Sequence, residues 1–411
     1  MLENLIKKNE SDRNTGLIRT YILVASFLLL LFFVIAVFSK GKIIELMAMG
    51  GDYNTSESDY WRQIVYASDL KNIYFNTDDA PFLPFSYLFY HLLFLINPFD
   101  APIRLESYRI ARDLTFNRLI YDMLLCIKTV IFYKGIEMVL RDRFDKKTIF
   151  LFSTMLFCSI PVLFGCIEHG NIIFLLYGLM LMALYLKDSD NRIFNEIALI
   201  LIAVCAAIKV YPAILGLLYL KEKRFKEAIR LVIYGLLFVF VPFIFTGGIN
   251  GLIQYLSVLK VFQTRTIPRY TSISPMLLAV VDTIAPELDK AKILPFNIMI
   301  QNIYLLLNIV SFFKCRRRSV AFILLCGILS IYVPDSYRYT AGYMIIPFVL
   351  LLLEEKIRKI DHVYFVLFIL IFTIPVYAYL IHITVIDFCV FLPIYIMSVV
   401  AYFDVWVKHE N

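Results

Sequence analysis

Charged residues and glycine are scarce in this sequence of 411 residues: 18% are Asp, Glu, Lys or Arg, and only 15 are Gly. A typical soluble domain carries about 25% charged and about 45–50% apolar residues. Here 60% of the residues are apolar and the mean hydropathy is +0.75. These values exclude a soluble globular protein. The apolar residues gather in runs of roughly 16–22 residues, long enough to cross a bilayer as a helix, so the sequence predicts an all-α polytopic membrane protein.

The sequence also has no Cys-x-x-Cys pair. Its seven cysteines lie in or beside apolar runs, where a thiol acts as a small hydrophobic group. We therefore expect neither a disulfide framework nor a zinc site. The net charge of +7 does not indicate nucleic acid, because the basic residues cluster in short loops between apolar runs.

These basic clusters predict the topology, since Lys and Arg are enriched in cytoplasmic loops. The five clusters lie near residues 7–19, 141–147, 221–230, 314–318 and 356–359. Between them we place about twelve transmembrane helices, with both termini inside and residues 1–411 as a single integral membrane domain. The predicted spans are 20–39, 119–140, 148–165, 170–187, 193–208, 210–221, 226–245, 290–313, 319–334, 339–353, 361–380 and 384–405. The first span follows Lys7, Lys8, Arg13 and Arg19, is too long for a signal-peptide core, and is expected to stay as an anchor.

Two apolar stretches do not fit as spans. If Phe82–Pro98 crossed the bilayer, the cluster at 141–147 would fall outside, so we predict a helix lying in the outer interface. Met276–Ile284 is short, carries Asp282 and is treated likewise. The topology leaves two outer loops, 40–118 and 246–289, and chemistry is expected on that side.

The runs 193–208 and 210–221 are too short for two full crossings, and we expect two short helices that meet at a break. Pro212 ends the helical ladder there, because it has no N–H to donate. Lys209 lies at this break between apolar neighbours, where a charge in lipid is unfavourable and usually functional. Snorkelling to the outer headgroups is the alternative.

Three carboxylates follow the first span, in Asp52, Glu57 and Asp59. A carboxylate at that depth, shielded from water, can act as a general base toward a hydroxyl. A solvated acidic loop is the alternative. A second polar group, Glu168–Asn171, lies where one span leaves the membrane and the next enters, and either lines a site or forms a simple polar turn.

A third polar stretch, Pro334–Tyr339, joins two spans at the outer face. The planar donors of Arg338 can hold a phosphate, and Tyr337 and Tyr339 can shape a sugar pocket. A structural ion pair between Asp335 and Arg338 is the alternative. The predicted topology places both Lys209 and Arg338 near the outer face of the membrane, which favours an anion site between helices.

The order of these features resembles the GT-C glycosyltransferases, and most closely the polyprenyl-phosphate-sugar-dependent branch of mannosyl- and arabinofuranosyl-transferase-like proteins. Asp59-Tyr60, Tyr66-Ala67 and Ile73-Tyr74 resemble the Asp-aromatic start of the first outer loop. The segment 80–85, with its two separated prolines, stands where the family has a Tyr-Pro-Pro-Leu motif. The stretch 104–118 occupies the place of a juxtamembrane helix.

Further motifs follow in the same order, and the resemblance covers about residues 20–350. Gly170-Asn171 resembles a Gly-Gln-x-Asn turn without its Gln. Lys209-Val210-Tyr211-Pro212 resembles a Lys-x-x-Pro break before a basic turn, and Ser272–Pro275 stands where relatives carry Asn-Gln-Ser.

The resemblance implies a GT-C-like fold and transfer of a sugar, a hexose such as mannose, from a polyprenyl phosphate to a glycolipid or glycan acceptor, with inversion. Asp59 would be the base, with Asp52 as its rival, and Lys209 and Arg338 would bind the departing phosphate. The branch works without a metal or another cofactor. The remaining substrate-binding candidates are His169, Asn171, Tyr211, Asp335, Tyr337 and Tyr339.

Two other functions remain open. A lipid-linked polysaccharide polymerase or ligase would carry its arginines in one dominant late loop, and a transporter or flippase would show repeated halves, which this sequence lacks. The rich use of Ile, Lys, Asn, Phe and Tyr suggests a bacterial source. We therefore expect a multi-pass protein of the inner membrane, surrounded by lipid, that acts at the periplasmic face in building the cell envelope.

Overall fold

The computed structural model describes residues 2–48, 57–77, 79–100, 107–264, 273–284, 287, 290–332, 337–380 and 386–407. These residues form helices, turns and bends, and no strand occurs among them. The all-α prediction is therefore confirmed for the part of the chain that is described.

Several helices have the length and composition of membrane spans. Four qualify among the described residues, namely Asn14–Phe38, Phe225–Phe245, Pro295–Lys314 and Ile386–Trp406. A bent pair, Lys146–Phe157 and Ile160–Ile167, adds a fifth if its 56° bend is counted within one span. The protein is thus an all-α polytopic membrane protein. Each of the twelve predicted spans falls on one helix or on two consecutive helical segments, but the number of crossings stays a prediction.

The chain divides into two compact units, each made of segments that are distant in the sequence. Unit 1 comprises residues 1–54, 136–168 and 267–411, and unit 2 comprises 55–135 and 169–266. Helix α7 (Thr115–Leu140) begins in unit 2 and ends in unit 1.

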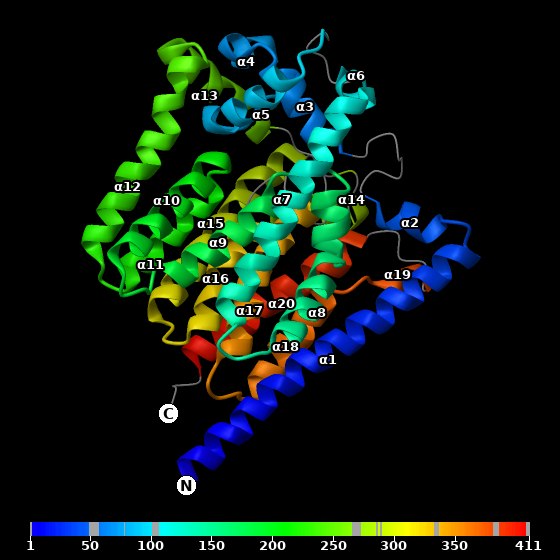
Figure 1. Ribbon diagram of the computed structural model, residues 1–411, viewed down its shortest axis with the longest axis vertical. Helices are drawn as coiled ribbons and strands as arrows, with labels where there is room; N and C mark the ends of the chain where they lie inside the picture. The colour runs from blue at the N-terminus through cyan, green and yellow to red at the C-terminus, as the bar shows by residue number, and fades with distance from the viewer. Residues whose placement is uncertain are drawn as a thin grey trace. The chain divides into compact units, whose positions relative to one another are not determined.

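Unit 2 contains the candidate residues 59, 169, 171, 209 and 211. Its other elements are α3 (Ser58–Ala67), η2 (Leu70–Asn72), α4 (Ile73–Asn76), α5 (Pro84–Ile96), α6 (Tyr108–Asp113), α9 (Ile173–Leu186), α10 (Arg192–Ile208), η5 (Tyr211–Leu215), α11 (Gly216–Lys221), α12 (Phe225–Phe240), η6 (Val241–Phe245) and α13 (Gly248–Thr264). Helix α10 packs against both α9 and α12, and the short helices α3, α4 and α5 gather with α13 at one end of this group (Figure 1).

The core of unit 2 is α9, and its lipid-facing side includes α12. Ten of the fourteen residues of α9 are buried. Helix α12 instead exposes Phe225, Ile229, Val232, Leu236 and Phe240, which recur at helical spacing. Such an apolar stripe is unfavourable in water and favourable against lipid.

Helix α7 approaches α9 closely through glycine. A Cβ added to Gly178 would lie 2.7 Å from the backbone oxygen of Ile131, and one added to Gly135 would lie 2.6 Å from the oxygen of Gly178. Small residues allow two backbones in a membrane to pack at this distance. This contact explains why glycine occurs inside both helices.

Unit 1 is built around α16, which is buried from Ser319 to Ile331. Helix α16 spans Arg318–Ile331, and the other elements of the unit are α1 (Leu2–Phe38), α2 (Lys42–Met47), α8 (Lys146–Phe157), the π-helix η4 (Ile160–Ile167), α14 (Ile273–Ile284), α15 (Lys290–Lys314), η7 (Arg338–Met344), α17 (Ile345–Leu353), α18 (Lys359–Ile371), α19 (Val376–Leu380) and α20 (Ile386–Trp406). Helix α16 packs against α15, α17, α20 and η7. The long helix α1 lies along α8 and α18 (Figure 1).

A network of ion pairs joins the ends of several helices in unit 1. Asp361 is fully buried and accepts hydrogen bonds from Nη1 of Arg317 at 2.5 Å and from the backbone N–H of Arg358 at 2.6 Å. Arg317 also pairs with Glu354 at 3.1 Å, and Arg358 with Asp404 at 2.5 Å. Asp361 therefore connects α18 to two arginines, one of which reaches α20.

We expect Asp361→Ala to destabilise the folded protein strongly. Removing Asp361 takes one carboxylate away from Arg317 and Arg358, which keep Glu354 and Asp404 as ion-pair partners, and leaves the backbone N–H of Arg358 without its acceptor. Loss of one partner from a buried ion pair costs about 3–5 kcal/mol. The control is Asp142→Ala, because Asp142 is 78% exposed and lies 3.8 Å from Arg141; its effect should stay within about 0.5 kcal/mol. Thermal unfolding in detergent measures both variants, and equal stabilities would contradict a structural role for Asp361.

Candidate functional site

The first candidate residue, Asp59, lies in the first turn of α3. This helix begins after Glu57, whose backbone oxygen accepts the N–H groups of Tyr60 and Trp61 at 3.0 and 3.2 Å. Glu57 has a positive φ of 59°, which is uncommon for a residue with a side chain. Tyr60 and Trp61 are buried, whereas Asp59 is half-buried. The packing of α3 therefore presents Asp59 at the margin of the core.

Three predicted site residues meet at this turn, although 112 positions separate Asp59 from Asn171. Nδ2 of Asn171 donates a hydrogen bond to Oδ2 of Asp59 at 2.8 Å, and the backbone N–H of Asp59 donates to the oxygen of His169 at 3.1 Å. Oδ1 of Asn171 accepts the N–H of Ile173 at 3.0 Å, so the start of α9 fixes the amide. His169 and Asn171 are 8% and 3% exposed. The carboxylate thus has a fixed orientation.

Only one oxygen of the Asp59 carboxylate is occupied by these contacts. Among the described residues, no side chain or backbone group donates a hydrogen bond to Oδ1 of Asp59. A carboxylate held through one oxygen keeps the other available to accept a proton from a bound hydroxyl. The arrangement is therefore suited to a general base.

Gly170 allows the turn at 169–171 to contact the start of α3. Its φ is +70°, and a Cβ at this position would lie 2.8 Å from Cβ of Tyr60 and 3.2 Å from Cα of Glu57. Only glycine adopts this conformation readily and leaves room for the neighbouring backbone. Glycine at 170 therefore allows the turn to lie directly against the start of α3.

Aromatic rings and one buried lysine surround the turn. The ring of Tyr60 lies 4.7 Å from those of Trp61 and Tyr121 and 5.9 Å from that of Tyr90. Lys128 is 4% exposed, and its Nζ lies 5.6 Å from the centre of the Tyr60 ring. Burial, followed by the nearby Tyr60 and Asp59, raises the pKa of Tyr90 well above its ordinary value. These rings limit the access of water to the first turn of α3.

The break at Lys209 occurs as predicted. Helix α10 ends at Ile208, and Lys209 has extended dihedral angles of φ −139° and ψ 125°. Nζ of Lys209 lies 3.9 Å from the centre of the Phe82 ring, and Tyr211 is half-buried at the start of η5. The oxygen of Ile208 accepts a hydrogen bond from Oγ of Ser86 at 2.8 Å. Helix α5 therefore supports the break that carries the lysine.

Helix α5 also connects this lysine with the Asp59 turn. Ser86 contacts the end of α10, and Tyr90, four residues later, contacts Tyr60. Residues four apart lie on the same helical face, about 5–6 Å from each other. Helix α5 thus contacts Tyr60, the neighbour of Asp59, and Ile208, the neighbour of Lys209, one helical turn apart.

Arg338 belongs to unit 1, as do the residues that it contacts. It is 6% exposed, its Nε donates to Oδ1 of Asp387 at 2.5 Å, and its Nη1 donates to the oxygen of Met47. The rings of Tyr337 and Tyr339 lie 5.8 Å apart. The predicted alternatives Asp52 and Asp335 lie outside the described residues. The carboxylate paired with Arg338 in the described structure is therefore Asp387.

Sequence reasoning missed three charged residues of these clusters, namely Lys128, Arg118 and Asp387. Lys128 could have been found, because a lysine within the predicted span 119–140 is unusual in lipid. Glu57 and Arg118 form a pair at 2.9 Å, and Arg338 pairs with Asp387, 49 residues away. No short-range pattern marks these two long-range pairs, because they depend on how distant helices pack.

The described residues contain no group of three His, Cys, Asp or Glu side chains that could hold a metal ion. All seven cysteines are free thiols.

Comparison with known proteins gives one family. The model of Glycosyltransferase family 87 matches residues 120–333, slightly more than half of the chain. The matched region includes His169, Asn171 and Lys209, and it begins after Asp59 and ends before Arg338. No curated protein matches the chain.

We expect Gly170→Ala to displace the start of α3. The added methyl group meets Tyr60 and the Glu57 backbone, and overpacking of this kind costs about 1–3 kcal/mol beyond the strain of a positive φ. Gly248→Ala is the matched control, because Gly248 has a φ of +63° with no atom within 4 Å of an added Cβ. Thermal unfolding of both variants separates the two effects, and equal destabilisation would contradict the close contact at Gly170.

Proposed function

The chain belongs to glycosyltransferase family 87, a family of GT-C-type membrane glycosyltransferases, and we propose that it transfers a sugar from a polyprenyl-phosphate donor with Asp59 as the general base. The acceptor is a hydroxyl of a glycolipid or glycan, and the transferred sugar is a hexose such as mannose. The hydrogen bond from Asn171 to Asp59 carries this proposal, because it links the carboxylate to the region that defines the family.

Asp59 removes the proton of the acceptor hydroxyl as this oxygen attacks the anomeric carbon. Asn171 holds Oδ2, and Oδ1 receives the proton. The polyprenyl phosphate leaves from the opposite face of the sugar, so the configuration inverts. General base catalysis of this kind contributes about 10²–10⁴-fold to a rate.

Lys209 stabilises the negative charge that develops on the departing phosphate. Its position at a helix break leaves the ammonium group beside Phe82, close to the helix that also contacts the Asp59 turn. A cation placed in advance where charge develops lowers the barrier, because it need not reorganise during the reaction.

Arg338 has a smaller part in this proposal than Lys209. Asp387 already compensates much of its charge, and two of its three guanidinium nitrogens are engaged with described residues. Tyr211, Tyr337, Tyr339 and His169 remain proposed contacts to the sugar or the lipid phosphate, as does Asp335 outside the described residues.

The proposed topology places this chemistry at the periplasmic face of a bacterial inner membrane. It has about twelve crossings with the loops 40–118 and 246–289 outside. The loop that carries Asp59 then faces the leaflet in which a polyprenyl-phosphate sugar would be presented, and the proposed role is in building the cell envelope.

Asp59→Asn should reduce sugar transfer by about 10²–10⁴-fold, because the amide cannot accept the proton. The assay uses purified protein in liposomes with a panel of polyprenyl-phosphate sugars. Asp52→Asn is the matched control and should keep most of the activity. If Asp52→Asn alone abolishes transfer, the base is Asp52. If the folded wild type transfers no sugar and binds no donor, a polymerase or transporter becomes the better explanation.

Lys209→Gln should lower kcat by about 10²–10³-fold, the effect of removing one group that stabilises charge in a transition state. Lys209→Arg should retain more activity, because it keeps the positive charge. Lys226→Gln is the control, since Lys226 is an exposed lysine of the same unit. An unchanged kcat in Lys209→Gln would contradict the phosphate role.

A further inference from the structure

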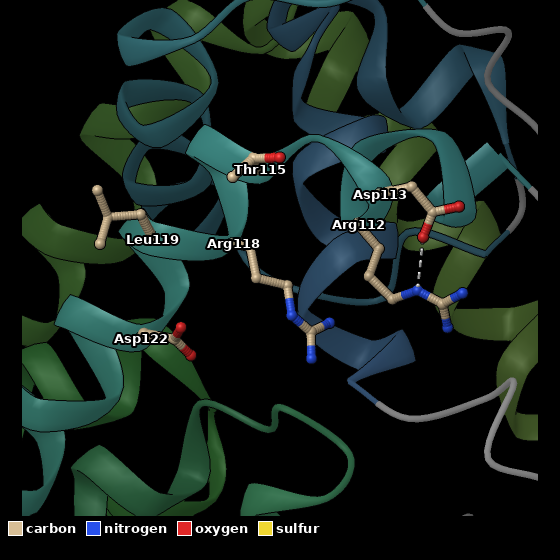
Figure 2. Close-up of a pocket in the computed structure, with 6 residues that line it drawn as sticks. All are labelled: Arg112, Asp113, Thr115, Arg118, Leu119 and Asp122. Carbon is tan, nitrogen blue, oxygen red and sulfur yellow. Dashed lines mark hydrogen bonds and ion pairs between the residues drawn. The ribbon is translucent and has the colours of Figure 1, made fainter.

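A pocket of about 540 Å³ lies in unit 2 where α6 meets α7 (Figure 2). Its volume falls within the range of about 300–1,000 Å³ that is typical of sites for small ligands. The lining residues are Arg112, Asp113, Thr115, Arg118, Leu119 and Asp122. None of these residues has a role in the chemistry proposed above.

The chain forms this pocket by breaking a helix. Leu114 is extended, with φ −77° and ψ 116°, so α6 ends at Asp113 and α7 begins at Thr115. The elbow is fixed by Asn117, which is 5% exposed and donates a hydrogen bond to the oxygen of Ala111 at 3.0 Å. The α7 residues that line the pocket follow the spacing i, i+3, i+4 and i+7, which places them on one helical face.

The charges of the pocket balance. Two arginines and two aspartates, Asp113 and Asp122, are among the lining residues. Nε of Arg112 pairs with Asp113 at 3.1 Å, whereas Nη1 of Arg118 pairs at 2.9 Å with Glu57, which is not a lining residue. Figure 2 shows the side chains of Arg112 and Arg118 extending to the same side of the elbow. Asp122 makes no hydrogen bond or ion pair with any described residue. The two carboxylates would repel an anion that enters the pocket, whereas they would not repel a neutral ligand.

A sugar ring matches this set of groups. Carboxylates accept hydrogen bonds from hydroxyls and guanidinium groups donate them, so the pocket offers both acceptors and donors. Leu119 adds an apolar surface, which suits the C–H face of a pyranose. We propose that this pocket binds a neutral pyranose of the acceptor glycan, with Asp122 accepting hydrogen bonds from its hydroxyls and Arg118 donating to its oxygens.

The pocket is also coupled to the Asp59 turn. Oε2 of Glu57 accepts hydrogen bonds from both Arg118, at 2.9 Å, and the indole of Trp61, at 3.0 Å. The backbone oxygen of Glu57 also accepts the N–H groups of Tyr60 and Trp61 in α3. A ligand that contacts Arg118 therefore acts on the residue that sets the start of the catalytic helix. This assignment to the acceptor rests on the proposed glycosyl transfer.

Trp61 provides a direct readout of binding. The protein contains only two tryptophans, Trp61 and Trp406, so Trp406→Phe leaves Trp61 as the sole indole. We titrate this variant in detergent with methyl α-D-mannopyranoside, methyl α-D-glucopyranoside and methyl β-D-galactopyranoside, and with inorganic phosphate for comparison. At least one glycoside should change the emission saturably, and phosphate should not compete with it.

Asp122→Asn in this background should weaken glycoside binding about tenfold or more, since a hydrogen bond to a charged acceptor is replaced by a weaker one. Asp142→Asn is the matched control and should leave binding unchanged. In the transfer assay, Asp122→Asn should raise the KM for the acceptor and leave kcat and the donor KM unchanged.

Four outcomes overturn the proposal: no response to any glycoside, equal responses in Asp122→Asn and its parent, displacement by phosphate, or an acceptor KM that is unchanged in Asp122→Asn. The binding assay needs no turnover, so the two proposals fail separately. Transfer without glycoside binding overturns the pocket assignment alone. Glycoside binding that depends on Asp122, in a protein that transfers no sugar, supports a sugar pocket and overturns the proposed reaction.

Discussion

A polar group buried inside a protein needs a protein partner, because burial removes the water that would otherwise hydrogen-bond it. This constraint explains the long-range contacts of the structure. Lys187 is 1% exposed and donates to both carboxylate oxygens of Glu222, at 2.6 and 2.8 Å. Asp361 and Arg338 meet the same requirement through partners 44 and 49 residues away. The contact between Asn171 and Asp59 follows this rule as well, and it also fixes the group proposed to react.

The apolar runs predicted most of the helices, because hydrophobic length is a local property. The bounds of α10 and α15 differ from the predicted spans by one residue at most. Pairs of residues that are distant in the sequence could not be predicted in the same way, because they depend on how the helices pack. An ion pair of Arg338 with its neighbour Asp335 was the alternative that the sequence offered, and Asp335 lies outside the described residues; among these the partner is Asp387, which the packing of α20 brings close. Lys128 was not predicted as a site residue, because it lies within the apolar run from 119 to 140.

The topology predicted the helix α5, but it did not predict which residues this helix contacts. The topology assigned the stretch to an interface helix, because a crossing there would have reversed the side of a basic cluster. The structure gives α5 a specific contact: Ser86 donates to the oxygen of Ile208 at the end of α10. The last carbonyls of a helix lack internal donors, and Pro212 has no N–H to supply one. Ser86 therefore satisfies a carbonyl that the break leaves open and holds Lys209 in place.

The spacing along α5 also bears on the proposed inversion. An inverting transfer needs the base and the group that stabilises the leaving oxygen on opposite faces of the anomeric carbon, with the sugar between them. In inverting glycosidases the two carboxyl groups are about 6.5–9.5 Å apart for a comparable reason. The contacts of α5 to the Asp59 turn and to the Lys209 break are one helical turn apart, about 5–6 Å between Cβ atoms, and both side chains extend beyond these anchors. Helix α5 thus contacts both the turn that carries Asp59 and the break that carries Lys209, the two groups that the proposed inversion needs on opposite faces of the sugar.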